Sequence, residues 1–108
     1  TRLKHAMLDA AIAARRAEKT LRRGYEGAAR MLLARSARAL VRIAFALERR
    51  WVPLDHWLER ELETLTDPER IGPAALEVMV TPKPEIVFAA LEPVFGRVLA
   101  SFRSPASG

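Results

Sequence analysis

The chain has 108 residues and a net charge of +5, half of its residues are apolar, and it contains no cysteine. This length suits one domain, and the lack of cysteine excludes disulfides, thiolate metal sites and cysteine nucleophiles. No apolar run approaches the roughly 18 residues of a membrane span, so we expect a cytoplasmic protein without a membrane partner.

The first predicted helix covers residues 2–23. Its apolar residues recur at three- and four-residue steps and most of them are alanines, so a neighbouring helix can approach closely. A basic last turn followed by Gly24 is a common helix end. The helix also carries a cluster of cations, for which a solvated surface is the simplest interpretation: Arg15, Arg16, Lys19, Arg22 and Arg23.

The second predicted helix covers residues 25–51 and should be the central one, because its apolar stripe is sustained along its whole length. Pro53 is expected to end it, since proline disfavours helical geometry at Val52 and lacks an amide proton. The residues expected to face the core are Tyr25, Ala29, Leu32, Leu33, Leu40, Ile43, Ala44, Leu47 and Trp51.

A line of arginines follows a second, narrower arc of this helix: Arg35, Arg38, Arg42 and Arg49. Residues 1–24 and 25–52 carry net charges of +5 and +4, whereas residues 53–81 carry −5. The arginines are therefore expected either to receive phosphates or to pair with the acids of residues 55–69, and the sequence favours neither interpretation.

Three shorter helices are predicted after Pro53, from Leu54 or Asp55 to Leu65, from Pro73 to Val80, and from Pro84 to Phe102. Asp55 and Asp67 are expected to act as helix caps, and Pro93 should kink or split the last helix. Residues 104–108 are expected to form a disordered tail. The sequence therefore predicts an all-α, single-domain bundle of four to five helices over residues 1–103.

Motifs for self-contained catalysis are missing from the sequence. It has no glycine-rich phosphate loop and no serine nucleophile beside a plausible base. His5 and His56 are too far apart to suggest a metal site, and Glu59, Glu61 and Glu63 do not share a helix face. We therefore assign no catalytic residue, metal site or cofactor to this chain.

Both tryptophans lie in the run Arg-Arg-Trp-Val-Pro-Leu-Asp-His-Trp-Leu of residues 49–58. Residues 24–65 resemble the C-terminal helical domain, HEPN-like in shape, of a bacterial nucleotidyltransferase family in the superfamily of the aminoglycoside nucleotidyltransferases. In that family a helix ends in a basic pair and an aromatic residue, and a proline and a basic residue then precede Trp-Leu. Here Glu48 replaces a neutral polar residue and His56 replaces the usual lysine.

This resemblance implies a non-catalytic domain that contributes to substrate binding or dimerisation. Its partner would be an upstream catalytic domain or a second subunit, with a homodimer possible, and we expect the chain, which starts at Thr1, to be a fragment. The catalytic domain would carry a Gly-Ser turn and an Asp-x-Asp pair that hold Mg²⁺ and a nucleoside triphosphate.

An anionic small molecule or a nucleotide is the substrate that the resemblance implies. The residues expected to contact it are Arg42, Arg49, Arg50, Trp51, His56 and Trp57. For the two tryptophans the alternative interpretation is structural, because large aromatic side chains commonly anchor a core at a helix corner.

Two other functions are compatible with the sequence. Arg50 and His56 have the spacing of the Arg-x(4–6)-His motif of HEPN-type ribonucleases, in which the histidine moves a proton and the arginine stabilises phosphate charge. Alternatively, the arginine-rich helices form a basic nucleic-acid-binding module, although the acidic segment after Pro53 argues against it.

Overall fold

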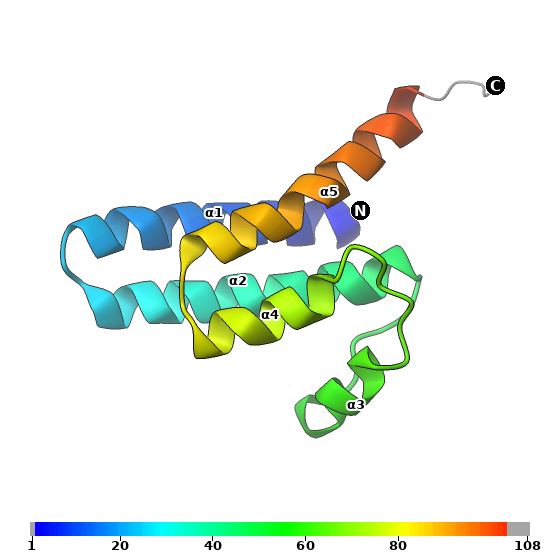
Figure 1. Cartoon of the computed structure of the whole chain (residues 1–108), viewed down its shortest axis with the longest axis horizontal. Helices are drawn as coiled ribbons and strands as arrows, with labels where there is room; N and C mark the ends of the chain where they lie inside the picture. Colours follow the sequence, from blue (N-terminus) through cyan, green and yellow to red (C-terminus); the bar gives the residue numbers. More distant parts are fainter. Residues whose placement is uncertain (1, 104–108) are drawn as a thin grey trace.

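Five α-helices and one 3₁₀ turn make up the described part of the chain, which covers residues 2–103 of a computed structural model, with side chains described for residues 2–97. The all-α, single-domain bundle predicted from the sequence is confirmed (Figure 1). The elements are α1 (Arg2–Arg22), α2 (Glu26–Leu47), η1 (Asp55–Trp57, 3₁₀), α3 (Leu58–Leu62), α4 (Ile71–Val80) and α5 (Pro84–Arg103).

Helices α1 and α2 form an antiparallel hairpin and share the most extensive contact in the bundle (Figure 1). The inner face of α1 consists mainly of buried alanines, so the two backbones lie close together, as the alanine stripe predicts. At the contact, the fully buried Ser36 hydroxyl donates a hydrogen bond of 2.9 Å to the carbonyl of Ala10. A small polar residue thereby ties one helix to the other without leaving an unpaired group.

The turn between α1 and α2 has the predicted glycine signature. Gly24 has a φ of +84°, in the left-handed region. Its N–H donates to the carbonyl of Leu21, and the N–H of Tyr25 donates to that of Thr20. This pair of hydrogen bonds is the Schellman motif, and it ends α1 where the sequence predicts.

The end of α2 differs from the prediction. The helix stops at Leu47 rather than continuing to Trp51, because Arg49 adopts the left-handed conformation with a φ of 56°. The N–H groups of Arg49 and Arg50 then donate to the carbonyls of Ala46 and Phe45. The expectation that Pro53 ends the helix is therefore wrong: a second Schellman motif, built without a glycine, ends it earlier.

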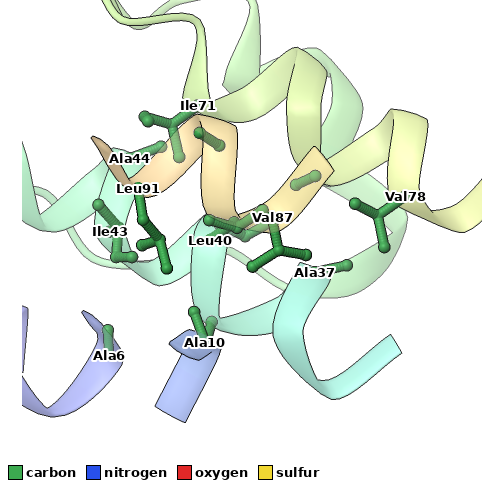
Figure 2. Close-up of a cluster of buried hydrophobic side chains, with 14 of the residues drawn as sticks. Ala6, Ala10, Ala37, Leu40, Ile43, Ala44, Ile71, Val78, Val87 and Leu91 are labelled. Carbon is green, nitrogen blue, oxygen red and sulfur yellow. The ribbon is translucent and has the colours of Figure 1, made fainter. Parts of the chain in front are cut away.

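The core lies between α2, α4 and α5, with the alanine face of α1 closing one side (Figure 2). Leu33, Leu40, Ile43 and Phe45 of the central helix are almost completely buried. Most of the predicted core stripe is confirmed, and Leu32 and Leu47 are half-buried at its edge. Tyr25 and Trp51 were placed in the core wrongly, since both lie just beyond the two ends of α2 and are exposed.

The predicted third helix is split into η1 and the short α3. Asp55 does not cap it, because its carboxylate is bound to Arg38 of α2 instead. Helix α4 begins at Ile71, slightly before the predicted Pro73, since the first turn of a helix leaves its N–H groups unbonded and tolerates proline.

The last helix, α5, continues across Pro93 to Arg103, so it is not split there. Its C-terminal part rises away from the other helices (Figure 1). The predicted tail at residues 104–108 lies outside the described residues. None of the helices within residues 2–103 is long and apolar enough to cross a membrane.

Candidate functional site

The six residues that the sequence singles out lie on α2, on the loop after it, and on η1. Trp51 is 78% exposed, so it is not a core anchor. The guanidinium carbon of Arg2 lies 3.9 Å from the centroid of its ring, which is a close cation–π contact. The sequence gives no sign of this pair, because the start of α1 meets the end of α2 only through the fold.

Trp57 is 47% exposed and belongs to a small stack at the turn η1. The ring of His56 lies 5.1 Å from the Trp57 ring, tilted by 50°, and the guanidinium carbon of Arg60 lies 5.7 Å from it. A partly exposed indole with two basic neighbours is suited to stacking against a flat anionic group.

Arg49 is an exposed cation at the left-handed position that ends α2. Within the described residues, its side chain has no hydrogen bond or ion pair with another side chain. Its neighbour Arg50, in contrast, is fully engaged. The Arg50 guanidinium donates to the Thr64 hydroxyl at 2.7 Å and to a Glu61 carboxylate oxygen at 3.2 Å, and it lies 5.4 Å from the ring of Phe45.

Arg50 therefore fastens the end of α3 to the end of α2 and has little capacity left for a ligand. His56 contacts the ring of Trp57, and no hydrogen bond joins Arg50 and His56 among the described residues. Arg50 and His56, which have the spacing of the ribonuclease motif, thus have different neighbours in the structure.

The line of arginines on α2 is held between two aspartates. Asp55 binds Arg38 through two hydrogen bonds of 3.0 and 3.1 Å, and this hydrogen bonding lowers the pKa of Asp55 and raises that of Arg38. Asp9 of α1 lies 3.5 Å from Arg35 and 3.3 Å from Arg42. The predicted pairing with residues 55–69 therefore holds for Arg38, while Asp9 is a partner that sequence reasoning missed.

Asp9 carried one usable signal: it sits beside the buried Ala10 on an otherwise alanine-lined helix face. A carboxylate next to a packed helix face needs a polar partner on the neighbouring helix, and that helix is arginine-rich. All of these pairs are about half-exposed, so each contributes little to stability.

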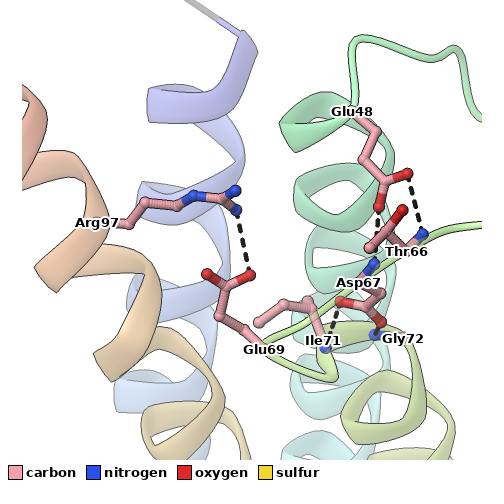
Figure 3. A network of polar contacts seen from close by, with 7 residues as sticks. All are labelled: Glu48, Thr66, Asp67, Glu69, Ile71, Gly72 and Arg97. Atoms are coloured by element: carbon pink, nitrogen blue, oxygen red, sulfur yellow. Dashed lines mark hydrogen bonds and ion pairs between the residues drawn. The ribbon is translucent and has the colours of Figure 1, made fainter.

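Glu48, one of the two residues that depart from the resembled family, links the end of α2 to the start of α4 (Figure 3). Its carboxylate accepts the backbone N–H of Asp67 at 2.8 Å and of Thr66 at 3.1 Å. These hydrogen bonds, the one from Asp67 first, hold the pKa of Glu48 below its usual range.

Asp67 continues this network, as its predicted capping role requires. Its two carboxylate oxygens accept the N–H groups of Ile71 and Gly72, both at 2.8 Å, and so cap α4 (Figure 3). A Cβ at Gly72 would meet the Asp67 carboxylate at 3.1 Å, so a larger residue there would press on the cap. Next to it, Glu69 pairs with Arg97 of α5 at 3.1 Å.

An apolar groove of about 310 Å³ runs between α2, α4 and η1. Its lining is mostly small or apolar side chains, and the Arg38–Asp55 pair also lines it. No group of three or more histidines, aspartates or glutamates within residues 2–103 is arranged to hold a metal ion.

The family described as "Domain of unknown function (DUF4037)" matches residues 2–58, which is α1, α2 and the loop through η1. The chain belongs to this family. The match includes Trp51, His56 and Trp57. No curated protein and no solved structure matches the chain.

Proposed function

We propose that this DUF4037 chain is the non-catalytic helical domain of a nucleotidyltransferase-like protein of the cytoplasm, and that its aromatic corner helps to bind an anionic, nucleotide-like substrate. The name aromatic corner denotes Arg2, Arg49, Trp51, His56 and Trp57, in which Trp51 contacts Arg2 and Trp57 contacts His56. The proposal rests on the resemblance of residues 24–65 to such domains and on one structural observation, that both tryptophans lie outside the core.

The exposure of the tryptophans carries the proposal. A buried indole contributes to stability by packing in the core, whereas an exposed indole contributes much less to core packing. Trp51 and Trp57 together hold much of the aromatic surface of the chain, yet neither is buried. Each has a guanidinium beside its ring. An aromatic face bordered by cations suits a nucleobase and its phosphates.

Individual residues take different parts in this proposal. Arg49 is the cation whose side chain is uncommitted, so it is the best placed to meet a phosphate. Trp51 and Trp57 would stack against the ligand, and His56 would form a hydrogen bond with it. Arg42 and Arg50 act indirectly, because their guanidiniums already bind Asp9 and the α3 end. Mg²⁺ and catalysis would belong to a partner domain.

The test uses tryptophan fluorescence, because Trp51 and Trp57 are the only two tryptophans of the chain. The chain is titrated with each of the common nucleoside triphosphates and Mg²⁺. We expect saturable quenching, and a loss of about tenfold in affinity for Trp51→Leu, since base stacking on an aromatic ring contributes about 1–3 kcal/mol. Tyr25→Leu, an exposed aromatic residue at the other end of α2, is the matched control.

Absence of quenching by all of these nucleotides would rule out nucleotide binding by the corner, and light scattering would then decide whether the domain serves dimerisation instead. A monomer that binds no nucleotide would overturn the proposal. Cleavage of RNA without metal, lost in His56→Ala, would replace it with the ribonuclease alternative. The coding sequence upstream of Thr1 should also contain the Gly-Ser and Asp-x-Asp segment.

A further inference from the structure

The C-terminal half of α1 carries a basic face that is separate from the aromatic corner. The five cations Arg15, Arg16, Lys19, Arg22 and Arg23 are all exposed. In Figure 1 this half of α1 lies at the hairpin end of the bundle, and the end of α2 that bears the aromatic corner lies at the opposite end. The two surfaces can therefore be examined independently.

The two acids of α1 do not neutralise this face. Asp9 turns toward α2, where it pairs with Arg35 and Arg42. Glu18 lies at long distances of 4.0 and 3.9 Å from Arg15 and Arg22, so these contacts are weak.

The acidic segment after Pro53 does not neutralise it either. Its carboxylates pair with Arg38, Arg50 and Arg97, which lie on α2, on the loop after α2 and on α5. Among the described residues, Arg16, Lys19 and Arg23 form no ion pair. The acidic segment thus pairs with cations outside α1, and the charge of the C-terminal half of α1 is left for an external anion.

The spacing of the five cations points to a linear polyanion. They occur at steps of one, three, three and one residues, which keeps them along one side of α1 over about 12 Å of helix axis. One strand of a nucleic-acid duplex presents about three to four phosphates over that distance. The number of cations and the number of phosphates are therefore comparable.

We propose that the basic face of α1 binds the phosphate backbone of a nucleic-acid duplex without reading its sequence. An anionic bilayer is the competing partner, because Leu8, Ile12 and Leu21 of α1 are also exposed. The regular line of cations favours the duplex, and vesicles are therefore included in the test. Binding through phosphates alone predicts similar affinity for DNA and RNA duplexes of different sequence.

The test measures fluorescence anisotropy of labelled DNA and RNA duplexes over salt concentrations from about 50 to 200 mM. With about three phosphates neutralised, log K should fall against log salt with a slope of about −3. Arg16→Gln should reduce the slope by about one unit, and the triple change Arg16→Gln, Lys19→Gln and Arg23→Gln should abolish binding.

Arg70→Gln is the matched control, because it removes one exposed cation at the start of α4 and should leave the slope unchanged. Circular dichroism verifies that each variant is folded. Unchanged binding by the folded triple variant would overturn the proposal. Equal binding of phosphatidylglycerol vesicles or of polyglutamate, lost in the same variants, would also overturn it, in favour of a membrane surface or an acidic protein. None of these results bears on nucleotide binding at the aromatic corner.

Discussion

At the scale of single residues, Arg49 combines backbone strain with an uncommitted charge. A non-glycine residue in the left-handed region costs about 1–2 kcal/mol, and Arg49 pays this to end α2 and turn the chain toward Trp51. Gly24 fills the equivalent position at the end of α1 without strain. The two helix ends therefore use the same hydrogen bonds but differ in their local stability.

Arg49→Gly should consequently stabilise the domain. The substitution relieves the backbone strain, but glycine loses more conformational entropy on folding. The net gain in the free energy of unfolding should be about 0.5–1 kcal/mol. Thermal unfolding should show a melting temperature higher by about 2–6 °C. Arg49→Ala is the matched variant, because it removes the same charge but keeps a Cβ.

The alanine variant should unfold within about 0.5 kcal/mol of the wild type. If the two variants have the same stability, backbone strain at Arg49 is not the cause. Nucleotide affinity separates the effect of charge from that of strain. Arg49→Gly and Arg49→Ala both lose the guanidinium, so both should bind nucleotide more weakly and to the same degree.

The residue pairs of the candidate site were the features that the sequence predicted least well. The exposed run at residues 49–58 was recognisable from its unusual composition, but the contacts Arg2–Trp51 and Asp9–Arg42 join residues far apart in sequence. Helical periodicity places a residue on a face and does not identify the element that the face meets. The role of Glu48 as an acceptor for two N–H groups was invisible for the same reason.

At the scale of elements, the connection between α2 and α4 depends on one carboxylate at each end. Glu48 holds the turn that contains Asp67, and Asp67 caps α4. Because hydrogen bonds lower the pKa of Glu48 in the folded state, its contribution to stability is present above the ordinary glutamate pKa of about 4.3. It is lost as the pH falls through that value toward the lowered pKa of the folded state.

Glu48→Gln should therefore destabilise the domain at neutral pH by about 1 kcal/mol, since an amide accepts these hydrogen bonds less strongly than a carboxylate. Urea unfolding at several pH values measures the effect. The wild type should lose stability on acidification, and the variant should lose less. The stability of the variant should still depend partly on pH, because the pKa of Asp55 is also lowered in the folded state.

Glu63→Gln serves as the control for this prediction, because Glu63 is exposed and its side chain forms no hydrogen bond or ion pair with a described residue. It should match the wild type at every pH. An equal loss of stability in the Glu48 and Glu63 variants at neutral pH would mean that the network of Figure 3 contributes nothing specific.

The elements were predictable where a local signal marks them. The alanine face, the central apolar stripe and the glycine after α1 fixed two long helices and one boundary. The end of α2 was misplaced because a proline suggested a later stop, while the actual stop uses an arginine in a conformation that sequence propensity disfavours. Tertiary contacts of Glu48 and Arg50 compensate for that strain, and a single sequence does not display them.

At the scale of the whole molecule, four helices build most of the core, and α3 reaches it mainly through Leu62. Helices α1, α2, α4 and α5 pack against one another, whereas α3 contacts mainly the adjoining turn η1 (Figure 1). Leu62 is its one buried residue. Apart from Leu62 and Leu58, the segment is held to the bundle by half-exposed polar contacts, those of Arg50 with Thr64 and Glu61 and of Arg38 with Asp55.

The domain should therefore open in two stages, with η1 and α3 detaching before the core unfolds. Local openings of this kind need far less free energy than global unfolding when few apolar contacts are broken. Hydrogen exchange measured by NMR should show amides of residues 58–62 exchanging much faster than those in the middle of α2. Arg50→Ala should accelerate exchange in residues 58–62 further, because it removes both polar ties of α3.

The same substitution should leave the slowest amides of α2 nearly unchanged, since Arg50 lies outside the shared core. Arg97→Ala provides the comparison: it removes the contact with Glu69 near α4 and should not alter exchange in α3. Equal protection of α2 and α3 would show that α3 belongs to the cooperative core.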